Sequence, residues 1–305
     1  MISITKGMKI ASVIHTDGEE DTLYYQDVED DVEPEIDTTL DNKLKLFKEF
    51  CHLDRKLSEA DIIMLLQHYK TGQIPEGKLG RKYTDACEFV KSSLKRYLNF
   101  GKTAKCFPII DKQSYRVSIS GLSGSGKSTF VNDFVKSHKP RKGAGVFLFS
   151  PIENDKSLSG LKDLIHVNLT DFERDEKKPF VLEDMPEGSI AIFDDIDSFT
   201  TKETQKKYQE FRDVCLQRGR HHCLSVLTIS HSPMQGFKSK AVNMECEYFV
   251  LFPSTNKRDT STLLKSYAGY SQDDINEVLN CKSRWVFVKK SIPAYWVSEH
   301  SVRLM

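Results

Sequence analysis

The chain has 305 residues, enough to bury a substantial core in one large domain or in one domain with an extension. Lysine plus arginine and aspartate plus glutamate each number 44, so the formal net charge is zero and no overall basic field indicates nucleic-acid binding. The seven cysteines contain no C-x-x-C pair, which argues against a disulfide framework or a zinc module and favours a reducing compartment. No apolar run is as long as a membrane span, and the first residues do not resemble a signal peptide, so we expect neither membrane insertion nor secretion.

Acidic residues dominate the N-terminal part of the chain. Residues 17–41 contain twelve carboxylates and no lysine or arginine. Such a run repels itself and lacks a core-forming pattern, so we expect residues 1–41 to form an acidic, flexible arm. A functional alternative is that this arm mimics DNA phosphates and occupies a basic groove in the same chain or on a partner.

Residues 42–105 have the periodicity of helices, and we expect a helical N-terminal region there. Apolar residues at helical spacing predict helices near residues 44–50, 62–69 and 89–98. The sequence Ser58-Glu-Ala-Asp61 has the pattern of a capping box that opens the second of them. The apolar side chains are expected to form a local core, because this region contains no catalytic constellation.

Residues 106–305 are predicted to form a nucleotide-binding domain. Residues 121–128 fit the phosphate-loop pattern G-x-x-x-x-G-K-[ST], known as Walker A, without a mismatch. A predicted strand at 116–120 precedes the loop and a predicted helix at 128–136 follows it, as the motif requires. The predicted nucleotide-binding residues are Gly121, Leu122, Ser123, Gly124, Ser125, Gly126, Lys127, Ser128 and Thr129.

The residue types of this loop predict ATP and Mg²⁺ as ligands. The glycines allow the backbone to turn tightly and to direct its N–H groups, with the positive end of the helix dipole, at the phosphates. We expect Lys127 to reach the β- and γ-phosphates and Ser128 to bind Mg²⁺.

A second motif follows about 65 residues later, at residues 189–195. Apolar residues there end in Asp194 and Asp195, which is the form of a Walker B strand. We expect Asp194 to bind the Mg²⁺ shell and Asp195 to orient or deprotonate the attacking water.

The remaining pattern alternates strands with helices. Further strands are predicted at 145–150, 224–230 and 247–253, helices at 200–220 and 257–267, and a terminal β-hairpin from 284–289 and 294–298. The class is therefore α/β, with a mostly parallel sheet between helices, a helical N-terminal extension and a C-terminal β-hairpin. The strand between Walker A and Walker B predicts an additional-strand P-loop NTPase of the RecA or FtsK type.

The chain resembles the genome-packaging ATPases of large double-stranded DNA viruses and virophages, within the FtsK-HerA superfamily. Besides the two motifs, the resemblance is based on the segment at 218–231, which contains Arg218-Gly-Arg220-His and leads into the next strand. It implies that Arg218 or Arg220 reaches into the neighbouring subunit's site as an arginine finger. Family members end this strand with a glutamine that senses the γ-phosphate. Here Ser230 and His231 are the alternatives for that sensor.

The resemblance implies an ATP hydrolase that moves double-stranded DNA into a preformed capsid. It implies a homo-oligomeric ring, a hexamer or a pentamer, and capsid or portal-type partner proteins at the packaging vertex. It also implies a location in the virion or in the cytoplasmic virus factory of an infected cell.

Other interpretations of these residues stay open. The chain could be a nucleoside or nucleotide kinase, or a nucleotide-binding structural subunit without productive turnover. Arg218 and Arg220 could simply be a solvated helix end that suits the helix dipole. A metal site at His221, His222, Cys223 and His231 matches no standard zinc spacing.

Overall fold

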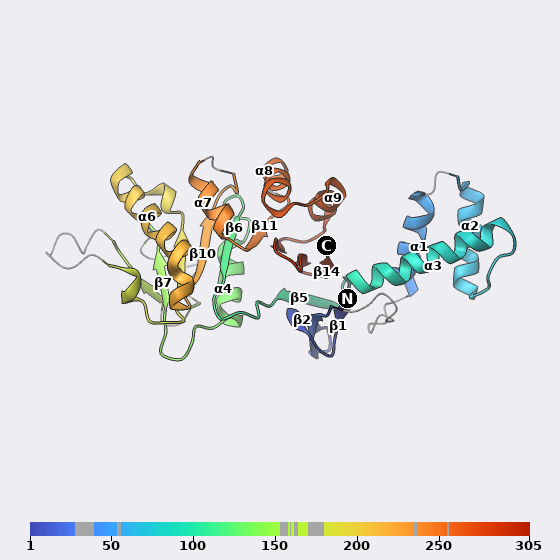
Figure 1. Ribbon diagram of the computed structural model, residues 1–305, viewed down its shortest axis with the longest axis horizontal. Coiled ribbons are helices and arrows are strands. Elements are labelled where there is room, and N and C mark those ends of the chain that lie inside the picture. The colour runs from blue at the N-terminus through green and yellow to red at the C-terminus, as the bar shows by residue number, and fades with distance from the viewer. Residues whose placement is uncertain are drawn as a thin grey trace. The chain divides into compact units, whose positions relative to one another are not determined.

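The computed structural model describes residues 1–27, 40–53, 56–152, 158, 160–161, 164–169, 180–234, 237–254 and 256–305. These residues form two compact units, the first comprising Met1–Phe107 with His300–Met305 and the second Pro108–Glu299 (Figure 1). The division lies close to the boundary expected between residues 105 and 106. The C-terminal residues from His300 onward, however, belong to the first unit and not to the predicted nucleotide-binding domain.

The first unit contains two groups of paired strands. One is a sheet of order β1-β3-β2-β5, and the other is the antiparallel pair of β4 and β14. Their bounds are β1 Ile2–Ser3, β2 Met8–His15, β3 Glu20–Tyr25, β4 Tyr97–Asn99, β5 Ala104–Pro108 and β14 Ser301–Leu304.

The strands β1 to β3 differ from the flexible arm expected at residues 1–41. Ile10, Val13 and Leu23 are buried on this small sheet, so its apolar side chains outweigh the repulsion between its carboxylates. The acidic residues at 17–21 lie in the β2–β3 turn and at the start of β3, where most are exposed to water. Residues 28–39 of the acidic tract lie outside the described residues.

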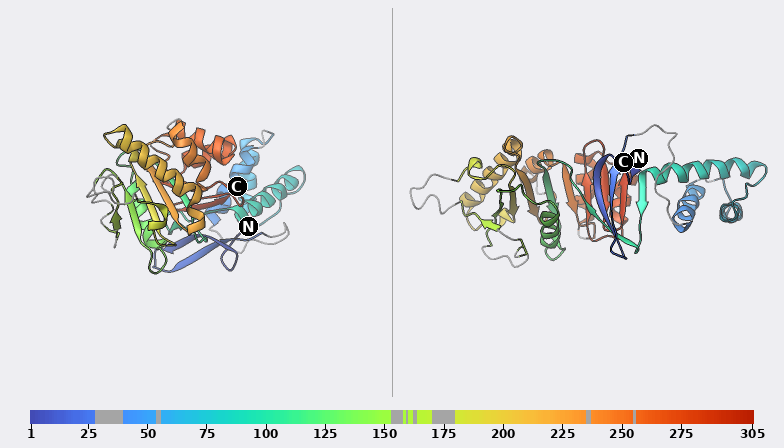
Figure 2. Two further views of the ribbon diagram at one scale, coloured as in Figure 1. Left: turned by 60° about the vertical axis from the view of Figure 1, so that its left-hand side comes forward. Right: turned by 90° about the horizontal axis from the view of Figure 1, so that it is seen from below.

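The helices of the first unit are α1 (Leu40–Leu53), α2 (Glu59–Thr71) and α3 (Lys78–Arg96), and α3 is the longest of them (Figure 2). The predicted capping box is present, because Ser58 and Asp61 exchange side-chain and backbone hydrogen bonds at the start of α2. The three helices share a core that consists of Phe47, Cys51, Ile62, Leu65, Tyr83, Ala86, Val90 and Leu94.

The second unit is built on a sheet of order β13-β12-β11-β6-β10-β9-β7-β8. The strands from β11 to β8 run parallel to one another, whereas β12 and β13 form an antiparallel hairpin. Their bounds are β6 Arg116–Ser120, β7 Val146–Phe149, β8 Leu164–His166, β9 Ile190–Asp194, β10 Ser225–Ser230, β11 Tyr248–Leu251, β12 Val286–Lys289 and β13 Tyr295–Ser298.

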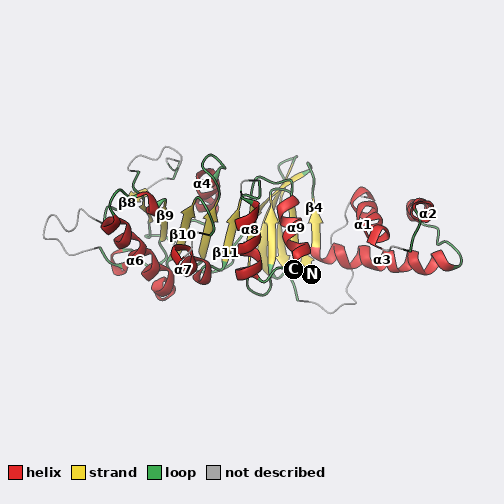
Figure 3. Ribbon diagram, turned by 90° about the horizontal axis from the view of Figure 1, so that it is seen from above, coloured by secondary structure: helices red, strands yellow, loops and turns green. Residues whose placement is uncertain are grey.

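Helices cover both faces of this sheet (Figure 3). On one face lies α4 (Lys127–Ser137), whose Phe134 packs on Phe287 of β12 with ring centroids 6.3 Å apart. On the other lie α6 (Lys202–Arg218) and α7 (Phe237–Glu245), and Phe211 of α6 packs on Phe149 at 5.2 Å. The helices α8 (Lys257–Leu263) and α9 (Gln272–Asn280) complete the unit. In the described part of the chain, no helix has both the length and the apolar character needed to cross a membrane.

The order of the strands confirms the predicted fold class. Strand β10 lies between β6, which leads into the phosphate loop, and β9, which ends in Asp194. The additional strand between the two motifs is therefore β10. The strand at 145–150, which separates the motifs along the chain, is β7 and lies on the far side of β9. This arrangement brings the ends of β6, β10 and β9 together at one edge of the sheet.

Candidate nucleotide-binding site

The phosphate loop connects β6 to α4 and depends on its glycines. Gly124 and Gly126 have φ angles of 75° and 101°, in the left-handed region that favours glycine. A Cβ on Gly121 would lie 2.8 Å from Oγ of Ser125 and 2.9 Å from Cδ2 of Phe252. Since Gly126 caps α4 without a side chain, the first N–H groups of α4 face outward at the positive end of the helix dipole. The loop is therefore suited to bind an anion.

Lys127 lies at the centre of this loop. Its side chain is buried, and Nζ donates to the carbonyls of Gly121 at 2.7 Å and of Leu122 at 3.1 Å. Burial lowers the pKa of Lys127, and the charges of Asp195 and then Asp194 oppose that shift. The two carbonyls occupy two of the three ammonium donors. Lys127 thus donates to its own loop and is also affected by the charges of both carboxylates of the second motif.

Asp194 and Asp195 have different environments although they are neighbours. Asp194 is the buried last residue of β9, in register with Ile229 of β10. Asp195 has a φ of 45°, which is rare for a residue other than glycine, and its carbonyl accepts the N–H of Ser198 at 2.8 Å. Because of this turn, the side chain of Asp195 does not continue the alternation of β9 that places Asp194. Its Oδ2 lies 3.2 Å from Nε2 of His231.

The predicted sensor residues lie between the two motifs. Ser230 ends β10 in register with Ser120, and its carbonyl accepts the N–H of Gly121 at 3.2 Å. The Ser230 hydroxyl donates to the carbonyl of Ser232 at 3.0 Å. His231 is half exposed and contacts Asp195. Of the two alternatives, His231 therefore touches the predicted base, whereas Ser230 fixes the start of the phosphate loop.

Arg218 and Arg220 lie at the opposite end of the sheet. Arg220 lines a surface cleft with Arg116, the first residue of β6, whereas Gly121 follows the last residue of that strand. At about 3.3 Å per residue, the length of β6 separates these two ends by roughly 15 Å. Arg218 lies 3.7 Å from Glu183, upstream of β9, and its side chain is 64% exposed. The structure does not bring either arginine to the phosphate loop of its own chain.

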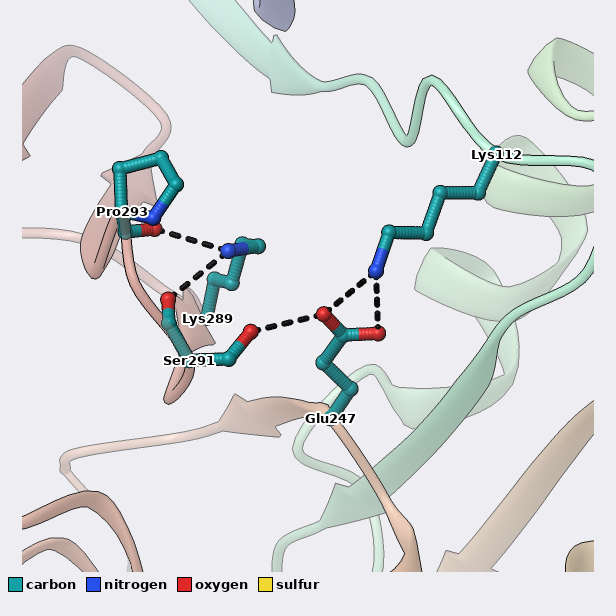
Figure 4. Close-up of polar contacts among 5 residues, drawn as sticks. All are labelled: Lys112, Glu247, Lys289, Ser291 and Pro293. Atoms are coloured by element: carbon teal, nitrogen blue, oxygen red, sulfur yellow. Dashed lines mark hydrogen bonds and ion pairs between the residues drawn. The ribbon is translucent and has the colours of Figure 1, made fainter.

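An ion pair and several hydrogen bonds connect the elements around the Arg220 cleft. Nζ of Lys112 lies 2.6 and 2.8 Å from the two carboxylate oxygens of Glu247, and Oε1 of Glu247 also accepts the hydroxyl of Ser291 at 2.7 Å (Figure 4). Nearby, Arg116 donates to the carbonyl of Leu216 at 3.0 Å. These contacts connect the segment before β6 to β11, to the hairpin and to α6.

The residues at the carboxyl end of the sheet fit a Mg²⁺-bound nucleoside triphosphate. Oγ of Ser125 is buried and has no hydrogen-bond partner among the described residues, although it lies inside the loop that would surround the phosphates. Ser128, half buried in the first turn of α4, and Asp194 would bind the metal, which neutralises charge on the phosphates when it is present. The other loop residues, Leu122, Ser123 and Thr129, are exposed.

Two residues near the loop were not predicted as site residues. Phe252, which follows β11, is buried against Gly121. Arg284 is exposed, and its Cδ lies 3.4 Å from where a Cβ on Gly126 would be. Both are more than 120 residues away in the chain, so no local motif marks them. The metal alternative fails on geometry, because His231 lies at the carboxyl end of β10 whereas residues 221–223 precede its amino end.

Known proteins show limited similarity to this chain, and no family model matches it. Over 194 residues it is 26% identical to "Uncharacterized protein V3" of Sputnik virophage. The aligned region covers 62% of this chain and 76% of that protein. The genome packaging NTPase B204 from Sulfolobus turreted icosahedral virus 2, in complex with AMP, is similar with a TM-score of 0.39 and 11% identity, covering 63% of this chain and 97% of that one. The pCW3 conjugation coupling protein TcpA has a TM-score of 0.41 and 13% identity, covering 67% of this chain and 65% of that one.

Proposed function

We propose that this protein is an ATP-driven motor that moves double-stranded viral DNA into a preformed capsid. One observation carries the ATPase part of this proposal. The phosphate loop, Asp194, Asp195 and His231 come together at the carboxyl ends of β6, β10 and β9, and the charges of both carboxylates act on Lys127. A phosphate loop with one carboxylate for the metal and another for the water suits hydrolysis of a phosphoanhydride.

Each residue has a separate task in the proposed reaction. The loop amides and Lys127 bind the β- and γ-phosphates, and Ser128 and Asp194 hold the metal. Asp195 orients a water for in-line attack on the γ-phosphorus and accepts its proton, so ATP and water give ADP and inorganic phosphate. The contact with His231 fixes the Asp195 carboxylate in the orientation that this step needs.

The position of the two arginines supports a ring of subunits. Arg218 and Arg220 are exposed at the amino ends of the strands, away from their own phosphate loop. A cation there can act on a nucleotide only if another subunit presents its site to it. Such a contact joins two different faces, and it gives a ring when the rotation from one subunit to the next closes after a full turn. Either arginine then stabilises charge on the γ-phosphoryl group of the neighbouring subunit.

The DNA and capsid partners are proposed from the motif resemblance. Because the formal net charge is zero, DNA contacts of the motor have to be local and not an overall basic field. The proposed place of action is the packaging vertex of a virus in an infected cell, where a ring around the duplex would couple ATP hydrolysis to DNA movement.

ATP hydrolysis measured with and without double-stranded DNA tests this proposal. We expect duplex DNA to stimulate turnover and the protein to displace the third strand of a triplex placed on that duplex, in an ATP-dependent manner. Lys127→Ala protein is the negative control for both readouts. Phosphate transfer to a nucleoside or nucleotide acceptor would instead identify a kinase. ATP binding without turnover, with or without DNA, would identify a structural subunit, and either result would overturn the motor.

A further inference from the structure

Helix α6 connects the two ends of the sheet that the proposed function assigns to two different sites. It begins shortly after Asp195 and ends at Arg218, and the following turn, η3 (Gly219–His222), carries Arg220. With 17 residues at 1.5 Å per residue, α6 spans about 25 Å. One rigid element therefore runs from the predicted base of a chain to the arginines that the chain presents to its neighbour.

The first half of α6 is fastened to the turn that carries Asp195. Gln205, Gln209 and Arg212 recur at positions i, i+4 and i+7, so they share one face of the helix. Nε2 of Gln205 donates to the carbonyl of Asp197, and Nε2 of Gln209 donates to Oδ1 of Asp197 at 2.5 Å. Asp197 lies in η2 (Ile196–Ser198), immediately after Asp195. Two side-chain amides thus fix the Asp195 turn to the helix.

The same face of α6 also borders the end of β10. A cavity of about 30 Å³ is lined by Asp197, by the buried Arg212 and by Ser230, among other polar and apolar residues. Because this space is large enough for a water molecule, the turn and the end of β10 do not meet there in a close-packed core.

The second half of α6 is fastened to the sheet and to the arginine turn. The carbonyl of Leu216 accepts Nη1 of Arg116 at 3.0 Å. The carbonyl of Gly219 accepts the N–H of Leu224 at 2.9 Å, and a Cβ on Gly219 would lie 3.3 Å from Leu224. The turn that carries Arg220 is therefore compact and follows the end of the helix.

We propose that α6 couples neighbouring subunits, and that Gln205 and Gln209 are the positioning residues through which it does so. The inference rests on the proposed arginine finger. Because the two amide contacts hold α6 against the Asp195 turn, they also set where the other end of the helix places Arg218 and Arg220. The turn at one site then sets the position of the cation that completes the next site.

A mixed-ring assay separates this coupling from a local role of the glutamines. Lys127→Ala subunits do not hydrolyse ATP themselves but still present their arginines to wild-type neighbours. We compare wild-type protein mixed with Lys127→Ala protein and wild-type protein mixed with Lys127→Ala subunits that also carry Gln205→Met and Gln209→Met. Methionine keeps the length and approximate volume of glutamine but cannot donate a hydrogen bond.

The expected result is a lower kcat per wild-type site in the second mixture, with the KM for ATP unchanged. Couplings between sites usually amount to about 5-fold to 150-fold, and the loss should fall in this range. The matched control is Gln272→Met in the Lys127→Ala subunit, which removes an exposed amide contact to Asn276 on α9 and should change nothing. Co-purification through different affinity tags establishes that each mixture contains mixed oligomers.

Two results would overturn the coupling, and they are distinguishable. If the glutamine variants lower kcat only when they are in the same subunit as an intact phosphate loop, then Gln205 and Gln209 merely orient Asp195 locally. If replacing both arginines by alanine in the Lys127→Ala subunits also leaves the neighbours' turnover unchanged, no arginine acts between subunits. The second result removes the arginine finger together with the coupling, whereas the first leaves the finger intact.

Discussion

Two lysines of the second unit share a local environment but not a role. Lys127 is 8% exposed and donates to two carbonyls of its own loop, and Lys289 is 2% exposed and donates to the carbonyls of Ser291 and Pro293 (Figure 4). Burial lowers the pKa of both, that of Lys289 to about 8. Both lysines are therefore buried, both donate to backbone carbonyls, and both have a lowered pKa.

The neighbours of the two lysines differ. The charges near Lys127 are Asp195 and Asp194, which lie beside a loop built to bind an anion. The carboxylate near Lys289 is Glu247, which already pairs with Lys112. A lysine with a lowered pKa thus indicates a functional site only where its neighbours can also act on a ligand. Elsewhere such a lysine stabilises the fold.

The largest expected difference between the two lysines is in turnover. Lys127→Ala should abolish measurable ATP hydrolysis, since loss of one positioned donor to the developing charge alone costs about 10²–10³ in rate and nucleotide binding weakens as well. Lys289→Ala should retain turnover, because it removes a contact far from the phosphate loop. Steady-state ATPase assays on folded proteins, checked by circular dichroism, make the comparison. Near-normal hydrolysis by Lys127→Ala would refute the motif assignment.

Asparagine variants divide the two carboxylates near Lys127 by role. Asp194→Asn should weaken binding of Mg²⁺-ATP, because it removes a metal ligand. Asp195→Asn should bind Mg²⁺-ATP normally but turn it over about 10²–10⁴ times more slowly, the usual contribution of a general base. Titration of a fluorescent nucleotide combined with single-turnover kinetics measures both quantities. Equal loss of binding in the two variants would show that the roles are wrongly assigned.

A smaller effect is expected from Arg284, the exposed cation beside Gly126. Arg284→Ala should raise the Kd for ATP by at most about fivefold, or about 1 kcal/mol, since an exposed charge contributes little in water. The effect should shrink at high salt because the interaction is screened. Arg258→Ala on α8 is the exposed control. An unchanged Kd at low salt would mean that Arg284 only packs against the loop.

Lys289 should affect the pH dependence of stability and not the chemistry. Its pKa falls from 10.5 in the unfolded chain to about 8 in the folded protein, so between these values the unfolded state binds more protons. The free energy of unfolding should therefore rise from pH 8 towards 10.5, by at most about 1.4 kcal/mol per pH unit for one proton. It should lose this gain as the pH falls through 8. Denaturant unfolding of wild type and Lys289→Met between pH 7.5 and 9.5 isolates the slope of the free energy of unfolding against pH. Lys265→Met is the exposed control. Equal slopes in all three proteins would contradict the assignment.

Continuous apolar runs made most strands of the second unit predictable. The strand expected at 116–120 has the bounds of β6, and those at 189–195 and 224–230 contain β9 and β10. Helix α7 was not predicted, because its nine residues are too few to show a clear helical period. In the N-terminal sheet, the carboxylates at the start of β3 conceal the buried Leu23, whereas β2, with the buried Ile10 and Val13, contains no carboxylate and was assigned to the arm with the acidic tract that follows it.

The site itself was predictable only where its residues form local motifs. Residues 121–128 and the Asp194-Asp195 pair have such patterns, since the loop and the strand end need particular residue types at fixed spacing. The position of β10 between them, the contact of His231 with Asp195 and the place of Arg284 depend on chain crossings that sequence spacing does not encode. The same holds for the distance of Arg218 and Arg220 from their own loop.

Complementation between two inactive variants tests the central claim that the two ends of this sheet serve the sites of two subunits. Arg218→Ala/Arg220→Ala protein should bind ATP with nearly unchanged affinity but lose about 10³–10⁵ in turnover, and Lys127→Ala protein should be inactive. When the two are mixed, some intact phosphate loops lie beside intact arginines, so a fraction of the ATPase activity should return. If no activity returns although co-purification shows mixed oligomers, the arginines act within their own chain or are only structural, and the account is contradicted.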